Sequence, residues 1–369
     1  MNRNPLSVLI VDDSALMRNL ISRIIEDAGD LVVGATAING DFALKKIPGI
    51  KPDVIILDLE MPGMNGIEFL KERKKLGINI PVIILSSIAE KGADITIEAL
   101  SLGASDFILK PSGSISRDIH VVSEKLLSLI RGFGNQYRRY FRKENEPREA
   151  EETPPAVRET EKLEEQSTTP DPCRQPEPVE IIVIGISTGG PAALREVFSR
   201  MNSSLSVPIV VVQHMPAEFT KKFAESLNRI SPLEIREAKN GDIIRPGRVL
   251  IAPGNQHIEL EKRSLASIVC LNSNSRVNGH RPSADVLFSS AAKYYGKNAM
   301  GVIMTGMGKD GAKEIGSIYK KGGITIGQDE ESSIVFGMPN VAIQYGFITH
   351  IVSLGEMADK IQELVQKYS

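Results

Sequence analysis

The apolar residues of this chain fall into short uninterrupted runs that alternate with longer stretches carrying a single apolar face. In the first third of the chain, runs at 8–11, 54–57 and 81–85 have the length of strands that are buried on both sides. Between the first two runs, apolar residues from 16 to 25 recur at helical spacing. This alternation of strands and amphipathic helices predicts a doubly wound parallel sheet.

The same alternation returns in the second half of the chain. Apolar runs at 181–184, 207–212 and 302–304 are separated by helical stretches, such as the one around Phe219. The simplest interpretation is a second, larger α/β domain with a mainly parallel sheet. The segment 233–272 is instead rich in short strand-like pieces and turns, and we expect an antiparallel hairpin there.

The composition changes sharply after Phe141. From there to about Glu180 the chain is dominated by Glu, Pro, Arg and Thr, and it offers almost nothing to bury. We interpret this segment as a flexible linker, whose ends would lie about 35 Å apart by random-coil scaling. The expected organisation is a first domain at 1–135, a charged linker at 136–178 and a second domain at 179–369.

Composition and charge disfavour several classes of protein. The formal net charge is only −2, so the overall balance does not call for a nucleic-acid partner. No run approaches the roughly 20 apolar residues that a bilayer-spanning helix needs, and the amino terminus lacks a basic region followed by an apolar stretch. We therefore expect a cytoplasmic protein without direct membrane insertion. Two cysteines in unlike contexts and five scattered histidines favour neither a disulfide framework nor a zinc site.

Charged residues follow three of the apolar runs in the first domain. Asp12 and Asp13 come directly after the first run, Asp58 after the second, and Lys110 after another. If these runs are neighbouring parallel strands, the four groups meet at the carboxyl edge of the sheet. Clustered carboxylates suit Mg²⁺, and Asp58 could then accept a phosphoryl group paired with Lys110. The alternative is that the acidic residues only cap the following helices.

These residues form part of a longer pattern. Ser86 directly follows the run at 81–85, and Phe107 lies three residues before Lys110-Pro111. Together with Asp12-Asp13 and Asp58-Leu59-Glu60-Met61-Pro62-Gly63, they closely resemble the receiver domains of two-component response regulators, over residues 6–133. The resemblance implies a flavodoxin-like fold with Mg²⁺ as cofactor and Asp58 as phosphoacceptor. It further implies metal ligation by Asp12, Asp13, Asp58 and the Glu60 carbonyl, and relay of the change by Ser86, Phe107 and Lys110.

In the second domain, the run at 181–184 leads into Gly185-Ile186-Ser187-Thr188-Gly189, which has the G-x-S-x-G spacing of a nucleophile elbow. Ser187 would then lie on a sharp strand-to-helix turn, and Pro191 suits the first turn of the helix that follows. The alternative is a glycine-rich phosphate-binding turn, although the sequence lacks both the P-loop and the dinucleotide-binding spacings.

Two further residues have the chemistry that an activated serine needs. His214 follows the run at 207–212 and would lie at the same edge as Ser187 if the two strands are neighbours. Asp310 lies in a glycine-rich loop after the run at 302–304 and could orient the imidazole, or it could cap a helix. In the order Ser, acid, His, the histidine would be His350, but its surroundings indicate a strand rather than a loop. We therefore expect Ser187, His214 and Asp310 to converge.

At this point the chain closely resembles the chemotaxis protein-glutamate methylesterases, the CheB family, over nearly its whole length outside the linker. The motifs that carry the resemblance are 185–191, Gln213-His214-Met215-Pro216, His280-Arg281-Pro282-Ser283-Ala284-Asp285-Val286-Leu287-Phe288 and Thr305-Gly306-Met307-Gly308-Lys309-Asp310-Gly311.

The resemblance implies hydrolysis of glutamyl γ-methyl esters on the cytoplasmic helices of methylated chemoreceptors, with release of methanol, and a related glutamine deamidation. It implies attack by Ser187, proton transfer by His214, orientation by Asp310 and an oxyanion contact from the Met307 backbone N–H. A chemotaxis histidine kinase would be the phosphodonor, and no cofactor is expected in the second domain.

Other residues in these motifs leave alternatives open. His280 and Arg281 could line the substrate cleft, or Arg281 could pair with Asp285 and fix a helix. Thr188 could assist the serine or act as a cap. For His257 we expect a structural role.

The pairing of a switch with a hydrolase suggests that the unphosphorylated receiver docks over the Ser187 cleft and hinders entry of a receptor helix. Two other output classes compete with this interpretation. A DNA-binding output predicts a small, basic helical module, whereas the second half is long and rich in strands. A nucleotide-binding output would use the loop at Gly189-Gly190.

Overall fold

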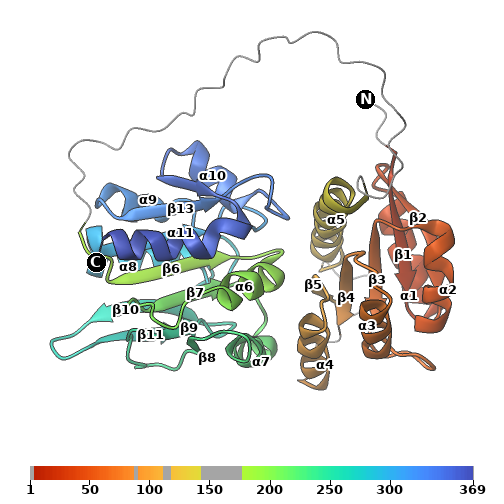
Figure 1. The fold of residues 1–369 in the computed structure, drawn as a ribbon, viewed down its shortest axis with the longest axis horizontal. Helices are drawn as coiled ribbons and strands as arrows, with labels where there is room; N and C mark the ends of the chain where they lie inside the picture. Colours follow the sequence, from red (N-terminus) through yellow and green to blue (C-terminus); the bar gives the residue numbers. More distant parts are fainter. Residues whose placement is uncertain (1–3, 87–89, 111–117, 143–176, 369) are drawn as a thin grey trace, which may run out of the picture.

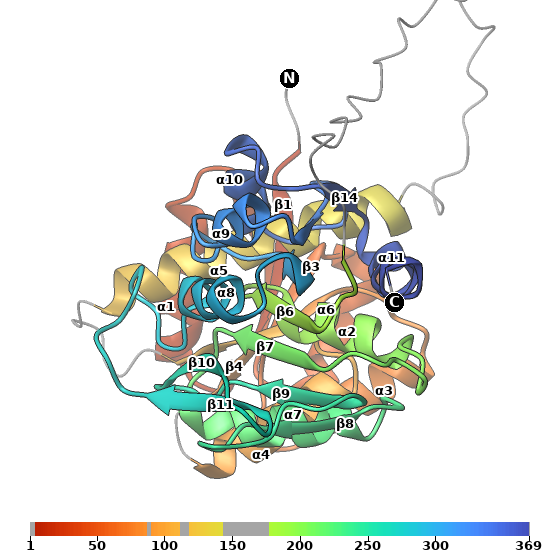
Figure 2. The ribbon, with the colours of Figure 1, turned by 90° about the vertical axis from the view of Figure 1, so that its left-hand side faces the viewer.

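The structure, a computed structural model, describes residues 4–86, 90–110, 118–142 and 177–368. Pro111 and residues 143–176 of the predicted linker lie outside the described residues. Two α/β domains are visible, one on each side of the molecule in Figure 1. In Figure 2 the C-terminal domain is in front and the N-terminal domain lies behind it.

The N-terminal domain is a five-stranded parallel sheet in the order β2-β1-β3-β4-β5. This is the flavodoxin-like order predicted by the resemblance. Its elements are β1 (Leu6–Val11), α1 (Ala15–Glu26), β2 (Leu31–Ala37), α2 (Gly40–Ile50), β3 (Val54–Asp58), α3 (Gly66–Lys75), β4 (Val82–Ser86), α4 (Glu90–Ser101), β5 (Asp106–Leu109) and α5 (Asp118–Tyr137).

Local sequence explains where these elements begin. Every residue of β3 and β4 is buried, as expected for apolar strands covered on both faces. Helix α1 begins after Ser14, whose side chain accepts a hydrogen bond from the backbone N–H of Met17. Helix α3 begins with a reciprocal capping box between Asn65 and Glu68. Because β1 and β3 pair in parallel, their carboxyl ends lie at the same edge of the sheet.

The predicted start of the linker at residue 136 is too early. Helix α5 continues to Tyr137 and is followed by a π-helical turn, η1 (Arg138–Arg142). The cause is Arg138, whose guanidinium pairs with the buried Asp53 carboxylate at 2.6 Å and donates to the carbonyls of Asn4 and Pro5. A buried carboxylate needs such a partner, and this ion pair holds the chain against the domain at Arg138. The helical structure therefore continues past residue 136, where composition alone suggested that the domain ends.

The C-terminal domain is built on a seven-stranded sheet in the order β14-β13-β12-β6-β7-β9-β8, in which every neighbouring pair is parallel. The predicted antiparallel hairpin is confirmed as β10 paired with β11. The elements are β6 (Ile181–Ile186), α6 (Gly190–Ser199), β7 (Ile209–Gln213), α7 (Ala217–Asn228), β8 (Glu234–Glu237), β9 (Arg248–Ile251), β10 (His257–Lys262), β11 (Ser267–Asn272), α8 (Ala284–Tyr294), η2 (Gly296–Asn298), β12 (Ala299–Ile303), α9 (Ile315–Lys320), β13 (Ile324–Gln328), α10 (Met338–Gln344), β14 (His350–Val352) and α11 (Leu354–Lys367).

The large sheet has apolar layers on both faces. Along β6, Ile181 and Val183 pack with α8 and α9, whereas Ile182 and Ile184 pack with α6, α7 and α11. Strand β6 is therefore buried on both sides at the centre of the sheet. Its carboxyl end is held rigidly between those of β12 and β7, which makes this edge a suitable place for a site.

Candidate active site

Three adjacent strands carry the residues predicted to converge. Strand β6 pairs with β7 on one side and with β12 on the other. Ser187 follows β6, His214 follows β7, and Asp310 lies in the loop after β12. Because parallel strands end at the same edge, all three side chains are brought to one side of the sheet.

The three side chains form a continuous hydrogen-bonded chain. His214 Nδ1 lies 3.1 Å from Ser187 Oγ, and His214 Nε2 lies 2.8 Å from Asp310 Oδ2. The serine is partly exposed and the aspartate is 1% exposed. With its proton on Nε2, the imidazole donates to Asp310 and leaves Nδ1 free to accept the serine proton. The ring therefore has the position that a general base requires.

Asp310 is fixed by several donors besides His214. Ser283 Oγ donates to its Oδ1 at 2.6 Å, Asn278 Nδ2 donates to Oδ1 at 2.9 Å, and the backbone N–H of Ala284 donates to Oδ2 at 2.7 Å. Burial alone would raise the pKa of Asp310, but the bonds from His214, Ser283 and Asn278 outweigh it and lower the pKa. Asp310 therefore stays ionised. It also accepts from the backbone N–H of the first residue of α8, whereas the helix that follows it in the chain, α9, begins after Glu314.

The turn after β6 is tight, but its strained residue is not the serine. Gly189 has φ of 81°, in the left-handed region that favours glycine, whereas Ser187 does not have a positive φ. The backbone N–H of Ser187 donates to the carbonyl of Thr305, and Gln213 Nε2 donates to the carbonyl of Ser187. The orientation of Ser187 is therefore fixed by Gln213 on β7 and by Thr305 in the loop after β12.

Backbone N–H groups surround the serine on two sides. Helix α6 begins at Gly190, three residues after Ser187, with Pro191 in its first turn. On the other side, Met307 lies in the loop after β12, and within the described part of the chain no acceptor contacts its backbone N–H. Thr188 is buried, and its carbonyl accepts from Thr305 Oγ1. The Met307 N–H is therefore suited to stabilising the negative oxygen of a substrate attacked by Ser187.

Of two residues near the cluster, Asn278 was given no role from the sequence and His280 was considered only as a residue lining the substrate cleft. Asn278 donates to both Asp310 and Asp285, and the ring of His280 stacks on that of His214 with centroids 3.9 Å apart. Both lie in the turn 277–280. The available signal was the dipeptide Asn278-Gly279, which is a strong predictor of a two-residue hairpin turn.

The proposed alternative pairing of Arg281 with Asp285 is wrong. Arg281 instead donates to Asn255 Oδ1 and to the carbonyls of Ser273 and Asn274. Asp285 accepts instead from Asn278 Nδ2 and from the backbone N–H of Glu314.

The other two histidines considered from the sequence lie away from the serine. His257 is 1% exposed and contacts the carbonyl of Ser275 through Nε2, as a structural residue would. His350 begins the strand β14, as predicted, and its Nδ1 contacts Thr349.

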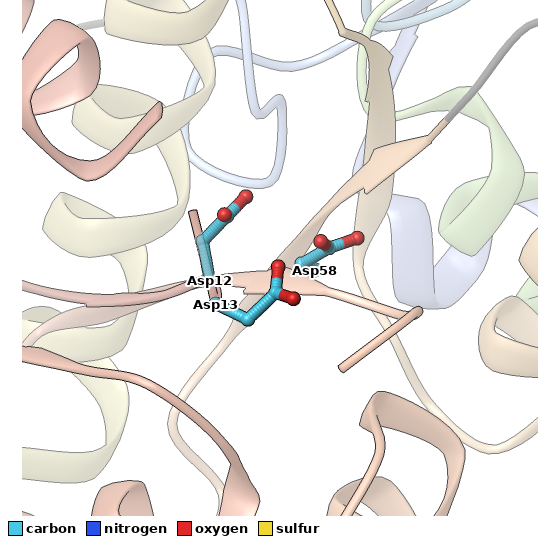
Figure 3. A group of neighbouring side chains, drawn as sticks. All are labelled: Asp12, Asp13 and Asp58. Carbon is cyan, nitrogen blue, oxygen red and sulfur yellow. The ribbon is translucent and has the colours of Figure 1, made fainter. Parts of the chain in front are cut away.

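The acidic residues of the N-terminal domain also converge. Asp12 and Asp13 follow β1, Asp58 ends β3, and each offers a carboxylate oxygen within 4.8 Å of the others (Figure 3). Lys110 Nζ lies 2.6 Å from Asp58 Oδ2 and 3.3 Å from Asp12 Oδ2. The predicted meeting of these four groups at one edge is therefore observed.

The charge balance at this edge suits a cation. Burial raises the pKa of Asp12, Lys110 lowers it, and Asp58 raises it further, with a net upward shift. Asp12 Oδ2 is buried and, among the described residues, it has no hydrogen-bond partner despite the nearby ammonium group. Asp12, Asp13 and Asp58 thus fit a hard cation with oxygen ligands. The backbone of Glu60 lies beside them, since its N–H contacts Asp58 Oδ1 at 3.3 Å.

The predicted relay residues connect this edge to the other domain. Ser86 ends β4, and its Oγ lies 2.6 Å from Thr96 Oγ1 on α4. A cavity of about 20 Å³ is lined by Asp58, Ser86, Thr96 and Lys110. Phe107, on β5, stacks on Phe219 of α7 with ring centroids 4.6 Å apart.

The N-terminal domain covers the edge of the C-terminal domain that carries Ser187. Helix α4 packs against α7, as Figure 1 shows, and Asp94 pairs with Lys222 at 2.7 Å. Next to Phe107, the buried carboxylate of Asp106 accepts a hydrogen bond from the backbone N–H of Gly189 at 2.7 Å. One domain thus contacts the turn that holds the serine of the other.

A cavity of about 550 Å³ lies between the domains. It is lined by α5, by the loop 330–336 and by Met307. Gly132 of α5 approaches this loop so closely that a Cβ atom would lie 2.2 Å from the carbonyl oxygen of Ile334. The cavity therefore lies beside Met307, whose backbone N–H would stabilise an oxyanion. The close approach of α5 to the loop 330–336 depends on the absence of a side chain at Gly132.

The fold and the two sites define a response regulator whose output domain is an α/β domain with a Ser-His-Asp cluster. Residues 8–118 match the family model of the response regulator receiver domain, and residues 182–361 match that of the CheB methylesterase. The chain belongs to the CheB methylesterase family.

Relatives cover nearly the whole chain. A protein-glutamate methylesterase/protein-glutamine glutaminase from Treponema denticola is 50% identical, over 98% of this chain and 99% of its own length. One from Bacillus subtilis is 41% identical, over 98% of each chain. The crystal structure of the Thermotoga maritima CheB methylesterase catalytic domain matches with a TM-score of 0.50 and 38% identity, over 51% of this chain and 99% of that one.

Proposed function

We propose that this protein hydrolyses glutamyl γ-methyl esters of chemoreceptors and deamidates receptor glutamines, under control of its receiver domain. The observation that carries the proposal is the chain of contacts from Ser187 through His214 to Asp310. The relatives that match along their whole length bear the names of both activities.

The geometry supports acyl transfer by a serine nucleophile. Ser187 Oγ attacks the ester carbonyl while His214 Nδ1 takes its proton, and Asp310 stabilises the imidazolium that forms. The C–O bond to methanol then breaks as the imidazolium returns its proton to the leaving oxygen. Water, deprotonated by the same imidazole, hydrolyses the acyl-enzyme and regenerates the serine. With a glutamine substrate, the same steps release ammonia.

The negative oxygen of each tetrahedral intermediate needs preorganised donors. The Met307 backbone N–H is a suitable donor, with Thr188 in support at the start of α6. One such donor contributes about 3 kcal/mol to lowering the barrier where this has been measured in serine hydrolases. We assign no cofactor to this domain.

In the receiver, Asp58 is the proposed phosphoacceptor, and Asp12, Asp13 and Asp58 with the Glu60 carbonyl would hold Mg²⁺. The bound cation would offset the charge of the incoming phosphoryl group. Lys110 pairs with the phosphoryl oxygens, while Ser86 and Phe107 transmit the change to α4 and β5. A chemotaxis histidine kinase is the proposed phosphodonor.

Regulation would act through the contact between the domains. Phosphorylation replaces the single negative charge of the Asp58 carboxylate with a phosphoryl group of about −1.5 to −2, which competes for Lys110. Movement of Phe107 would then weaken its stacking on Phe219 and release Asp106 from Gly189. We propose domains at 1–142 and 179–369, joined by a linker that permits this separation.

The substrate would be the cytoplasmic helices of methylated receptors, and the protein itself would be cytoplasmic. Among the residues described, none of the helices is long and apolar enough to cross a membrane. Nucleic acid is not a proposed partner, in agreement with the net charge of −2.

The test is methanol release from methylated receptor membranes by the wild type, Ser187→Ala and Asp58→Asn. We expect no turnover in the serine variant. The Asp58 variant should keep its basal activity and lose stimulation by a phosphodonor. Full activity of Ser187→Ala would end the proposal for the site, and normal stimulation of Asp58→Asn would end that for the switch.

A further inference from the structure

A tight turn at 277–280 lies against the Ser187 cluster. Val277 and His280 exchange both backbone hydrogen bonds, at 3.1 and 2.9 Å. The two residues between them, Asn278 and Gly279, have φ of 51° and 81°. Two positive φ angles between such a pair are the mark of a type I′ turn, for which Asn-Gly is the preferred dipeptide. Local sequence therefore fixes the relation between the side chains of Asn278 and His280.

Asn278 bridges two carboxylates. Its Nδ2 lies 2.9 Å from Asp310 Oδ1 and 2.7 Å from Asp285 Oδ2. An amide nitrogen carries two hydrogens, so one nitrogen satisfies both acceptors. Asp310 and Asp285 are 1% and 7% exposed, whereas Asn278 itself is exposed. The amide therefore lies on the solvent side of two buried carboxylates and offsets their mutual repulsion.

His280, on the other side of the turn, contacts His214. The two rings are nearly parallel, at 9°, with centroids 3.9 Å apart. Burial and the neighbouring His214 lower the pKa of His280 to about 4, so its ring is neutral near pH 7. His214 is thus held at its edge by Asp310 and on its face by a neutral aromatic ring.

We propose that the turn 277–280 is the positioning element of the hydrolytic site, with Asn278 as a positioning residue for Asp310 and His280 as one for His214. This inference rests on the function proposed above for the Ser187 cluster. Asn278 contacts Asp310 and His280 contacts His214, so both act on Ser187 through the residues they hold. They would keep the imidazole aligned while it takes and returns the serine proton.

Asn278 is not needed to attach Asp310 to the fold. Ser283 Oγ and the Ala284 N–H also donate to Asp310, at 2.6 and 2.7 Å, and tie it to the start of α8. Loss of the Asn278 amide should therefore leave the domain folded and Asp310 in place. What it removes is the donor on the solvent side, which restrains the direction of the carboxylate.

The first test is Asn278→Gly in the full chain, activated by a phosphodonor and assayed on methylated receptor membranes. Glycine tolerates the positive φ, so only the amide is lost. We expect kcat to fall about 10- to 100-fold, the size that misplacement of a catalytic group produces, with KM unchanged. Lys51→Gly is the control, because Lys51 also has positive φ, 43°, but lies in the receiver. An Asn278→Gly enzyme with the wild-type kcat would overturn the inference.

A second pair of variants separates positioning from charge balance. Asn278→Asp adds a third carboxylate and should lower both kcat and the thermal midpoint. The double variant Asn278→Asp with Asp285→Asn has the same number of charges as the wild type and keeps an amide–carboxylate pair between positions 278 and 285. Position 278 then no longer offers a donor to Asp310. Positioning predicts that stability returns and kcat does not. Recovery of kcat together with stability would mean that the role is only structural.

For His280, the comparison is between His280→Phe and His280→Ala. Phenylalanine keeps a flat aromatic face against His214, so this variant should keep more of the wild-type kcat than alanine does. Equal loss in both would refute the stacking role. Ser187→Ala is assayed in parallel: if it retains activity, the proposed function itself fails, whereas an inactive Ser187→Ala beside a fully active Asn278→Gly removes only this inference.

Discussion

The carboxylate of Asp106 accepts a hydrogen bond from the backbone N–H of Gly189 at 2.7 Å, and so joins the receiver to the turn that carries Ser187. Its other oxygen accepts from the N–H of Phe107 at 2.8 Å. Burial raises the pKa of Asp106, Lys125 and the two N–H donors lower it, and the net shift is upward. The contact thus places a buried acidic group at the start of α6, where the hydrolytic domain would otherwise present free N–H donors.

Asp106→Asn should raise the activity of the unphosphorylated enzyme. Asparagine offers one acceptor oxygen for two N–H donors, so either Phe107 or Gly189 faces an opposing NH₂ group. Loss of a buried hydrogen bond of this kind costs about 1.5–3 kcal/mol, roughly 10- to 150-fold in the docking equilibrium. Methanol release without phosphodonor measures the effect.

The control for Asp106→Asn is Asp94→Asn, which removes an ion pair with Lys222 that is half exposed and contributes little. Its basal activity should stay near that of the wild type. An Asp106→Asn enzyme that remains as inhibited as the wild type, with a normal phosphorylation rate, would show that the Gly189 contact does not hold the domains together.

Gly132→Ala should also relieve inhibition, through packing. A Cβ at this position would meet the carbonyl oxygen of Ile334 at 2.2 Å, so α5 must move away from the C-terminal domain. Within the receiver itself, alanine in a helix is favoured over glycine by about 1 kcal/mol. We therefore expect higher basal activity together with an equally stable or more stable receiver.

Gly49→Ala is the matched control for this helix substitution, since a Cβ there meets nothing within 4 Å. Small-angle scattering of both variants would report domain separation. A compact, inhibited Gly132→Ala protein would contradict the expectation.

Asp12→Asn should stabilise the receiver and impair its phosphorylation. The pKa of Asp12 is raised in the folded protein, so its ionisation above that pKa costs folding free energy, while the protonated form below the unfolded pKa does not. A neutral amide removes this cost at neutral pH. The thermal midpoint should rise without Mg²⁺, and the further rise on adding Mg²⁺ should be smaller than in the wild type. A lower midpoint in the variant would show that the pairing with Lys110 outweighs burial.

Asp310→Asn should lower kcat by about 10⁴-fold, as the corresponding change does in serine proteases. The amide cannot accept from His214 in the same way and favours the wrong tautomer. Ser283 and the Ala284 N–H donate to different oxygens of Asp310, and asparagine keeps only one of these acceptors. Circular dichroism should therefore still show a folded domain, while the thermal midpoint should fall by the cost of one buried hydrogen bond. Asp285→Asn is the comparison, because Asp285 bonds to Asn278 and Glu314 rather than to His214, and it should retain most activity.

The sequence allowed both sites to be predicted because residues that directly follow buried strands have little freedom. Ser187 and His214 lie one residue beyond their strands and Asp58 is the last residue of β3, so the carboxyl-edge rule was sufficient to predict their positions. The role of Asn278 was not predicted, because Asp310 is remote along the chain and Asp285 was considered as a partner of Arg281. The pairing of Arg281 with Asp285, one of two alternatives considered, is not formed, because proximity along the chain says nothing about which carbonyls compete for a guanidinium.

By itself, the sequence determined the alternation of strands and helices, the turn at Asn278-Gly279 and the residues available for chemistry, because these depend on local periodicity and backbone preference. Only the tertiary structure decided the strand order that brings β6 between β12 and β7, the burial that raises the pKa of Asp12, the hydrogen bonds that lower that of Asp310, and the contact of Asp106 with Gly189. These depend on which distant segments share a low-dielectric interior, and such long-range pairing leaves no periodic signal in a single chain.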